Sequence, residues 1–551
     1  MLKAIATFCV LAFTSYEGLK LIHHVVRRKM IRQQTGMSDL ELLGTARKDG
    51  QKIRGTAVIC GGSIGGLASA RICHDHFERV IIVEPEAWLS TADACPVNVS
   101  ELQHKRSRLM QWESYQGTQV WPRMWFQKLF QNFERECKAS DIPLVPANIK
   151  YHFSGLKLKT PQGQYNGDLP KHICSGRPGF ETLLRRLVIG QEEYPNIQQI
   201  HGTVIGYEKD PENPTYLSQV LVRQGDQEII AIPATLVIDC TGLAMAGSKF
   251  LRRLGFGIGD SGHGKERSLD DLKMKYDQVV HYSTYSIPLT DEQNHRLPPE
   301  ARNYGVVGIY FPDSRAGERR VLLAQKSDKN IMQLCSGNWG SFELPNNLNE
   351  YETFARSLRC QVPVDAFWYQ LFEVLKETED SATLKNVRIP PSTYTPFHLA
   401  ANMPSNWVAL GDSVMHVNPI FGQGIAKAFL GTASLNTLLH EVHPDCVPKT
   451  FAKTFFDMQA TKIEPLWDSV KAVDYNFDST EPLPGETLDT DSGKRWFFRH
   501  VQILATKDDH IASVWWHVRN FLVPPFDFFH PDIVLKVFRE AIKGSLLPAK
   551  D

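Results

Sequence analysis

Residues 54–86, RGTAVICGGSIGGLASARICHDHFERVIIVEPE, decide the fold that this sequence predicts. Residues 57–60 form a short apolar run that indicates a buried strand, and a glycine cluster follows it at once. Apolar side chains then recur at helical spacing over 67–76, and residues 80–83 indicate a second buried strand that ends at Glu84. A strand, a tight turn, a helix and a strand ending on an acid form the βαβ unit that binds an adenosine diphosphate.

The turn of this unit supplies candidate contacts to a pyrophosphate. Glycine at 61 allows the sharp turn, and its neighbours let backbone N–H groups approach phosphates at the positive end of the helix. Serine takes the middle glycine position of the G-x-G-x-x-G pattern, and its hydroxyl can itself meet a phosphate. Glu84 stands where an acid accepts the hydroxyls of an adenine ribose. An ordinary turn of an α/β protein is the alternative. The candidate residues in the turn are Gly61, Gly62, Ser63, Gly65 and Gly66.

Length and composition describe a globular protein. At 551 residues the chain is too long for one ordinary core, which predicts two closely packed domains. The 61 basic and 61 acidic residues cancel, so nothing in the charge favours nucleic acid as a partner. Ten cysteines without a CxxC pair argue against both a disulfide scaffold and a metal site.

The N-terminal segment differs from the rest of the chain. Residues 4–14 are almost all apolar, and further apolar residues precede the basic triplet at 27–29. Residues 1–29 therefore predict a membrane anchor, although the run is short for a span, and a helix on the membrane surface or a simple pro-extension is the alternative. This predicts membrane association, for instance at the endoplasmic reticulum with the protein body in the cytosol, and otherwise a cytoplasmic protein. The polar residues 30–53 are interpreted as a linker.

Arginines after the second strand are further candidates for the pyrophosphate. Arg106 and Arg108 lie in a charged segment at 103–111, for which a solvated charge run is the alternative. Arg177 stands near the start of the helix predicted over 180–188, where a proline favours helix initiation.

The middle of the chain alternates helices and strands. Residues 119–137 have apolar side chains four apart, so Trp121 and Trp125 are interpreted as the core face of a helix rather than as a pair that stacks on a cofactor. Strand patterns follow over 197–239 and predict a β-meander and then a buried strand that ends at Asp239, shortly before Gly242.

A second module is predicted after residue 260. Strand patterns fill 275–330, and helical patterns follow at 348–358 and 363–376. We assign this sheet-based module to substrate binding. After residue 440 the chain is mainly helical, with aromatic segments that are either ordinary core, a cap over a substrate tunnel or a membrane-facing surface.

A third motif follows the second module. Residues 407–410 predict a buried strand that runs into a Gly-Asp pair, and a proline and a G-Q-G turn then open a helix. This order places a carboxylate against a polyhydroxyl chain and a helix N-terminus against an electron-poor ring. A generic strand–loop–helix is the alternative. The candidate residues are Gly411, Asp412, Pro419, Gly422, Gln423, Gly424 and Ile425.

Together the three motifs resemble those of the group A FAD-dependent monooxygenases. This superfamily includes aromatic hydroxylases and squalene-epoxidase-like enzymes, with geranylgeranyl reductases and flavin halogenases as cousins. The motifs are GGSIGG with Glu84, DCTG at 239–242, and GD-x6-P-x2-GQG from Gly411.

The resemblance implies an α/β fold and a division of the chain. A GR2-type, Rossmann-like FAD-binding domain is interleaved with a β-sheet substrate domain, and a mainly helical C-terminal region follows. The implied ranges are 54–260 and 388–440 for the FAD-binding domain, 261–387 for the substrate-binding domain and 441–551 for the helical cap.

Carried over by position, the resemblance also implies roles for single residues. Glu84 would bind the adenine ribose, and the glycine turn would line the pyrophosphate. Asp412 would hydrogen-bond the ribityl chain. The loop and helix end formed by Pro419, Gly422 and Gly424 would lie beside the flavin pyrimidine ring, where the helix N-terminus stabilises negative charge on the reduced flavin.

This sequence departs from the hydroxylase pattern at two places. Cys240 and Thr241 separate Asp239 from Gly242, a form closer to the reductase and halogenase cousins. Hydroxylases favour a histidine where this chain has Met415, and His416 beside it is a weak catalytic candidate; no other catalytic residue is identified. The Trp-x-Trp-x-Ile-Pro signature of flavin halogenases is absent.

The function that the resemblance implies is monooxygenation of a lipophilic small molecule. NAD(P)H would reduce FAD, O₂ would add at C4a, and the hydroperoxyflavin would hydroxylate or epoxidise a terpenoid, prenylated phenol or polyketide of secondary metabolism. An FAD-dependent dehydrogenase or reductase without oxygen insertion is the alternative. A non-enzymatic flavin-fold binding protein is a minor alternative.

Overall fold

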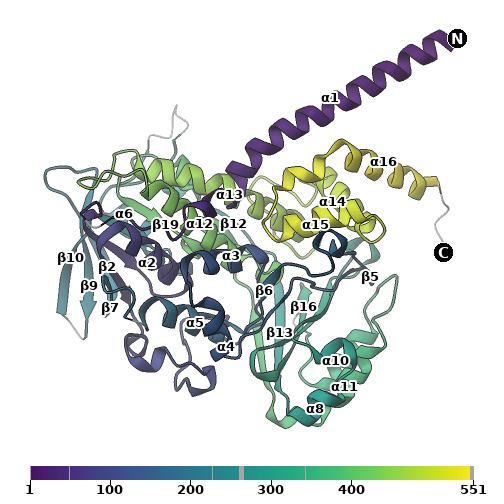
Figure 1. Ribbon diagram of the computed structural model, residues 1–551, viewed down its shortest axis with the longest axis horizontal. Coiled ribbons are helices and arrows are strands. Elements are labelled where there is room, and N and C mark those ends of the chain that lie inside the picture. The colour runs from purple at the N-terminus through teal and green to yellow at the C-terminus, as the bar shows by residue number, and fades with distance from the viewer. Residues whose placement is uncertain are drawn as a thin grey trace.

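Two large β-sheets, three smaller ones and a helical C-terminal region make up the described part of the protein (Figure 1). The sheet that contains β1 and β2 lies at one end of the molecule, and the sheet that contains β13 and β16 lies at the other (Figure 1). In helices α1 and α16 the side chains of residues 2–13 and 544–546 are outside the described part. The computed structural model describes residues 2–48, 50–190, 192–225, 228–259, 266–341 and 343–546.

The first sheet has five parallel strands in the order β19-β11-β1-β2-β7. Helix α2 (Ile64–His76) connects β1 to β2, so the predicted βαβ unit is confirmed. The apolar run at 57–60 is fully buried, as expected for a parallel sheet that is covered on both faces. The strands are β1 (Ile53–Cys60), β2 (Phe77–Glu84), β7 (Ile197–His201), β11 (Leu236–Asp239) and β19 (Trp407–Ala409).

The order of these strands brings the three sequence motifs to one edge of the sheet. Cys60 at the end of β1 pairs with Asp239 at the end of β11, which in turn pairs with Ala409 of β19. Because parallel strands end at the same edge, the loops after β1, β11 and β19 are neighbours there.

The predicted β-meander is also confirmed. Three antiparallel strands form a separate sheet in the order β10-β9-β8. They are β8 (Thr203–Lys209), β9 (Leu217–Gln224) and β10 (Glu228–Pro233), and the chain then enters β11.

Helices pack around the first sheet and bury the predicted tryptophans. Trp121 and Trp125 of α3 are fully buried, and the Trp125 ring stacks on Phe429 of α12 with ring centroids 4.2 Å apart. Both tryptophans are therefore core residues, as predicted. The helices are α3 (Val120–Leu129), α4 (Phe133–Ala139), α5 (Arg177–Ile189), α6 (Ala246–Arg253), α12 (Gly424–Leu439) and α13 (Phe451–Asp474).

The second sheet has seven strands in the order β17-β13-β16-β15-β14-β4-β5. Strands β4 and β5 extend it through a parallel pairing of β4 with β14, although they fall within 54–260, the range predicted for the FAD-binding part. The sequence therefore crosses between the two sheets earlier than predicted. The strands are β4 (Tyr151–Phe153), β5 (Leu156–Lys157), β13 (Val280–Pro288), β14 (Gly305–Phe311), β15 (Arg320–Ser327), β16 (Ile331–Trp339) and β17 (Thr383–Arg388).

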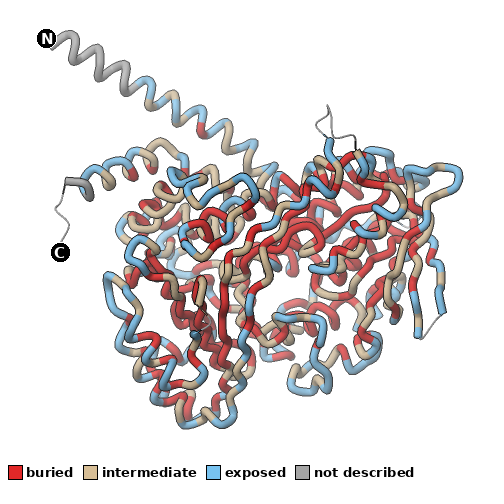
Figure 2. The backbone as a smooth tube through the Cα atoms, turned by 180° about the vertical axis from the view of Figure 1, so that it is seen from behind, coloured by how far each residue is buried: buried red, intermediate tan, exposed pale blue. Residues whose placement is uncertain are grey.

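Helices cover both faces of this second sheet, and Figure 2 shows a buried interior enclosed by exposed loops and helices. Alternate strand residues face opposite sides: Leu322 packs with α10 and α11, and Leu323 packs with the C-terminal helices. The predicted helices of the second module and of the C-terminal region are thus confirmed. They are α10 (Leu348–Arg356), α11 (Phe367–Lys376), α14 (Ser492–Ala505), α15 (Asp509–Arg519) and α16 (Pro531–Leu546).

The segment predicted as a linker, 30–53, is packed against the protein body instead. Helix α1 (Leu2–Gln34) runs into its first residues, and Leu40 and Leu43 are buried. Asp39 forms an ion pair with Lys462 of α13 at 2.8 Å, with both side chains almost fully buried. The linker prediction is therefore wrong. One of the polar residues of this segment, Asp39, forms a buried ion pair that holds the segment against α13.

Helix α1 projects from the body at the N-terminal end (Figure 1). Leu19, Leu21, Ile22 and Val25 are exposed on its described part. Within the part of the chain that the structure describes, no helix combines the length and the hydropathy needed to cross a membrane. Most of the apolar run at 4–14 has side chains outside that part, so membrane association through the N-terminus stays a prediction.

Removal of one partner of the buried pair should destabilise the protein strongly. We expect Asp39→Ala to cost about 3–5 kcal/mol, because it leaves the Lys462 ammonium buried without a counter-charge. The double variant Asp39→Ala/Lys462→Met should recover part of this loss. Urea denaturation measures the free energy of unfolding.

The control is the exposed pair of Arg54 and Asp445, whose atoms are 2.8 Å apart. Asp445→Ala should cost less than about 1 kcal/mol. Equal costs for Asp39→Ala and Asp445→Ala would contradict the role assigned to Asp39.

Candidate active site

A single cavity runs along the edge where β1, β11 and β19 end and continues to the second sheet. Glu84 and Asp412, which the sequence predicts at opposite ends of one cofactor, both line it. Most of the other predicted site residues line it as well. They are Gly61, Gly62, Ser63, Gly65, Arg106, Arg108, Arg177, Gly242, Gly411, His416, Pro419, Gly422, Gly424 and Ile425. Gly66, Asp239 and Gln423 are not among the described lining residues.

The turn after β1 requires glycine at two positions. Gly61 has φ of +115°, and a Cβ atom there would lie 2.5 Å from the carbonyl oxygen of Cys240. A Cβ on Gly66 would lie 1.8 Å from the Gly61 carbonyl oxygen, so Gly66 allows α2 to pack against the turn. Gly65 instead faces open space, with no atom closer than 3.9 Å to a Cβ placed there. The first N–H groups of α2 therefore face an open part of the cavity, as anion binding requires.

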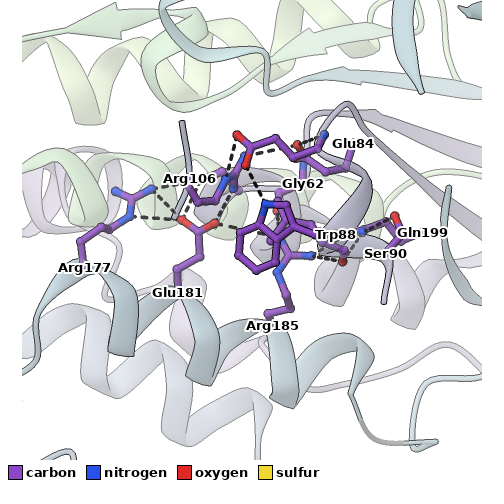
Figure 3. A network of polar contacts seen from close by, with 12 residues as sticks. Gly62, Glu84, Trp88, Ser90, Arg106, Arg177, Glu181, Arg185 and Gln199 are labelled. Carbon is purple, nitrogen blue, oxygen red and sulfur yellow. Dashed lines mark hydrogen bonds and ion pairs between the residues drawn. The ribbon is translucent and has the colours of Figure 1, made fainter. Parts of the chain in front are cut away.

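The Glu84 carboxylate lies at the end of β2 and is almost fully buried. It accepts hydrogen bonds from the backbone N–H of Gly62 at 2.9 Å and of Glu86 at 3.0 Å, and Arg106 lies 3.3 Å away (Figure 3). These contacts fix the orientation of the carboxylate. A carboxylate has about four lone-pair positions, so acceptor capacity remains for the hydroxyls of a ribose.

Arg106 lies between Glu84 and Glu181 in the network that Figure 3 shows. Burial opposes the ionisation of Glu181, but the guanidinium groups of Arg106, Arg177 and Arg185 outweigh it and lower the pKa of Glu181 to about 2. Arg106 was predicted to bind pyrophosphate, and the structure places it among carboxylates instead.

Two other predicted arginines are placed differently. Arg177 donates a hydrogen bond to the Ser63 hydroxyl at 3.0 Å and so reaches the phosphate turn. Arg108 is exposed and lines the cavity.

The middle motif holds the cavity edge together. Asp239 is fully buried, and its carboxylate accepts hydrogen bonds from Thr241, from the N–H of Gly247 and from the Ser413 hydroxyl. Ser413 also accepts a hydrogen bond from the N–H of Gly242 at 2.8 Å. Asp239 therefore stabilises this edge of the sheet without being among the described lining residues, whereas Gly242 lines the cavity.

The Asp412 carboxylate is paired with a lysine that the sequence analysis gave no role. The ammonium of Lys427 lies 2.7 Å from Asp412, and the His416 ring lies 3.6 Å from it. These groups outweigh the desolvation of the Asp412 carboxylate and hold its pKa well below its usual value. In the sequence, the sign of this pair is a charged residue, Lys427, on the otherwise apolar first turn of α12. In the structure this lysine is almost fully buried.

The N-terminus of α12 is open toward the cavity. A Cβ placed on Gly424 would have no atom within 4 Å. Because Lys427 is already paired with Asp412, the backbone N–H groups of this helix end supply the partial positive charge at the position predicted for the flavin ring.

Asp474 positions the loop before α12 and was also missed. Its carboxylate accepts hydrogen bonds from Asn418 at 2.8 Å, from the Trp339 indole at 2.9 Å and from the Tyr276 hydroxyl at 2.9 Å. Burial raises the pKa of Asp474 to about 6 despite these three donors. Asp474 thus joins the loop to Trp339 of the second sheet. It lies 56 residues from Asn418 in sequence, and no local pattern indicates these contacts.

Comparison with known proteins supports the fold. No protein-family model matches the sequence, and no curated protein matches it. Among solved structures, the chain is similar to the flavin-dependent brominase Bmp2, with 13% identity, coverage of 89% of this chain and 100% of the brominase, and a TM-score of 0.50. It is also similar to a flavoprotein/dehydrogenase from Cytophaga hutchinsonii, with 11% identity, coverage of 89% and 100%, and a TM-score of 0.54. A third similar structure is the Diels-Alderase PyrE3 of the pyrroindomycin pathway, with 12% identity, coverage of 85% and 81%, and a TM-score of 0.51.

The fold is thus that of flavin-dependent enzymes. This fold agrees with the resemblance of the sequence motifs to those of the group A FAD-dependent monooxygenases. The residues present fit FAD: an open helix end beside the glycine turn, an oriented carboxylate at Glu84, a second carboxylate at Asp412 and an open helix end at Gly424 all face one cavity.

Asp474→Asn should remove one component of the pH dependence of stability. Unfolded aspartate titrates near pH 4, so the folded protein holds this proton to a higher pH than the unfolded chain does. The contribution of Asp474 to stability is therefore greatest below about pH 4 and falls, by roughly 3 kcal/mol in all, as the pH rises through about 6. Urea denaturation measures the free energy of unfolding of the wild type and of Asp474→Asn at each pH. The difference, wild type minus variant, should fall by roughly 3 kcal/mol as the pH rises from below about 4 to above about 6.

Asparagine fits the same contacts, since its oxygen can accept from Trp339 and Asn418 while its amide donates to the Tyr276 oxygen. The exposed Asp478 supplies the control, Asp478→Asn. A pH-independent difference between the wild type and Asp474→Asn would refute the titration assigned to this carboxyl.

Proposed function

We propose that this protein is an FAD-dependent monooxygenase that hydroxylates or epoxidises a lipophilic small molecule with O₂ and NAD(P)H. The observation that carries the proposal is the continuity of the cavity: it joins Glu84 and the glycine turn to Asp412 and the α12 N-terminus, and then reaches the apolar wall of the second sheet. A cofactor at one end and a substrate at the other would meet inside one cavity.

Each part of the chain has a distinct task in this proposal. Glu84 orients the adenine ribose, the first N–H groups of α2 bind the pyrophosphate, and Asp412 accepts hydrogen bonds from the ribityl chain. The bound FAD supplies the redox chemistry that activates O₂. Gly424 at the α12 N-terminus, with Lys427 nearby, stabilises negative charge on the reduced ring.

The second sheet provides the water-excluding wall. Tyr282, Ile309, Leu323 and Cys335 line the cavity and belong to a buried cluster that the C-terminal helices complete. Exclusion of water protects a reactive oxygen species from unproductive loss. This wall supports the choice of a lipophilic substrate.

An FAD-dependent dehydrogenase or reductase is the second candidate. It is favoured by the separation of Asp239 from Gly242 and by the similarity to a flavoprotein/dehydrogenase. Both candidates need the same FAD site, so they differ only in whether oxygen enters the product.

Asp412→Ala should weaken FAD binding by about 10- to 150-fold, the effect of removing a hydrogen bond to a charged group. Quenching of FAD fluorescence during titration of the apoprotein measures the dissociation constant. Asp457→Ala, at a surface pair with Lys453, is the matched control and should bind FAD as the wild type does. Unchanged FAD affinity in Asp412→Ala would remove Asp412 from the site.

The reaction itself is tested by oxygen-18. The purified protein should take up FAD, consume O₂ in the presence of NADPH and a lipophilic alkene or phenol, and place one oxygen-18 atom in the product, as read by mass spectrometry. Substrate oxidation without oxygen-18 would support the dehydrogenase. A colourless protein that takes up no FAD would exclude both enzymes and leave a binding protein.

A further inference from the structure

The cavity contains one charged group at its second-sheet end. Arg519, the last residue of α15, is half-buried and lines the cavity together with the apolar residues of the second sheet. Tyr115, whose backbone N–H donates to the Thr284 hydroxyl of β13 at 3.1 Å, lines the same cavity, as does Cys335. Arg519 is therefore at the end of the cavity where the proposed substrate would lie.

The Arg519 guanidinium has no counter-ion in the described part of the chain. It makes no hydrogen bond or ion pair there, whereas the other inward cations of the cavity each have a carboxylate partner. These pairs are Arg106 with Glu181, Arg177 with Glu181 and Lys427 with Asp412. Arg108 also has no partner in the described part but is exposed, so water can satisfy it.

The backbone that carries Arg519 is firmly held. The neighbouring Asn520 accepts a hydrogen bond from the N–H of Val120 at 3.1 Å and donates one to the Trp516 carbonyl at 2.9 Å. The Trp516 indole donates to the Ala147 carbonyl at 2.7 Å. Both side chains are almost fully buried. The base of Arg519 is thus fixed to α3 and to the segment before β4, which restricts how far its charge can move toward bulk water.

His172 lines the same end of the cavity and adds no second charge there. The Thr118 hydroxyl lies 2.5 Å from the Ile173 carbonyl oxygen, so its proton must lie between these two oxygens. Thr118 then accepts, at 3.2 Å, from Nδ1 of His172, and this leaves Nε2 as the lone-pair nitrogen. Nε2 is buried and has no partner in the described structure. Burial and the nearby Arg519 lower the pKa of His172 to about 4, so the ring is neutral at pH 7.

An unpaired cation in an apolar pocket is costly, and folded proteins normally pair or hydrate such a group. A guanidinium stays charged even when burial lowers its pKa, so the charge has to be matched from outside the chain. We propose that this end of the cavity binds the carboxylate of an apolar organic acid, with Arg519 as its counter-ion.

The inference rests on the proposed function, because it takes the second-sheet end of the cavity as the substrate pocket. It narrows the lipophilic substrate to a carboxylic acid. Guanidinium and carboxylate form two parallel N–H···O bonds, which fixes the direction of the acid as well as its charge. The apolar body then lies along Ile309 and Leu323.

Ligand binding to the wild type and to Arg519→Gln tests the assignment. The probes are benzoate, naphthoate and decanoate, each compared with its primary amide by isothermal titration calorimetry. The wild type should bind at least one acid about 10- to 150-fold more tightly than its amide, and Arg519→Gln should lose this preference while it keeps the affinity for the amide. Arg519→Lys should keep part of the preference, because it retains the charge but not the paired hydrogen bonds.

Two controls separate binding from folding. Arg539→Gln removes an exposed arginine of α16 and should leave the acid preference unchanged. Arg519→Gln should raise the midpoint of thermal unfolding of the ligand-free protein, since it removes an unpaired charge. If Arg519 only supported the fold, Arg519→Gln would lower the midpoint of thermal unfolding instead.

The outcomes distinguish this inference from the proposed function. Equal binding of acids and amides, no binding of any acid, or an unchanged preference in Arg519→Gln would overturn the carboxylate site even in a protein that binds FAD. A protein that binds acids through Arg519 but takes up no FAD would overturn the proposed function and leave the carboxylate site intact. FAD content is therefore measured in both proteins by flavin absorbance.

Discussion

The buried carboxylate of Asp239 determines the geometry on which the site depends. It accepts hydrogen bonds from the loop after β11 and from Ser413 after β19, so it locks the second and third motifs to each other. Strand β11 also pairs directly with β1, which carries the glycine turn. One desolvated carboxylate between two parallel strands thus sets the relative position of the groups that would hold both halves of FAD. Burial raises the pKa of Asp239, and the four surrounding donors oppose that rise.

Most of the charged side chains that lie in or near the cavity are paired with a side chain of opposite charge. At the Glu84 end, carboxylates and guanidinium groups alternate so that each buried charge faces an opposite one. At the Asp412 end, Lys427 has the same effect. Such pairing removes the desolvation cost of isolated charges and leaves backbone N–H groups and helix ends as the source of positive potential. Arg519, which has no such partner in the described part of the chain, departs from this pattern, and it is the group to which we assign the proposed carboxylate ligand.

Much of the fold could be predicted from the sequence because the decisive signals are local. The βαβ unit, the meander and the turn at Gly422–Gly424 each depend on spacings within a few residues, and the structure confirms the elements expected there. The packed segment at 30–53 could not be predicted, because a polar sequence does not show that Asp39 meets Lys462 on α13. The joining of β4 to β14 is likewise a pairing between distant segments. In the site, Lys427 and Asp474 act through partners on other elements, and only their positions in space reveal them.

The two ends of the cavity are therefore built from different structural features. The coenzyme end depends largely on backbone conformation, such as the positive φ of Gly61 and the open start of α12, and short motifs encode that conformation. The far end is assembled from side chains of β6 (Lys171–Ile173), the second sheet and α15, which lie far apart in sequence. Because the C-terminal helices both close this end and supply Arg519, changes there can alter the substrate while they leave the FAD motifs untouched. In the proposed function, specificity would thus depend mainly on residues that no motif marks.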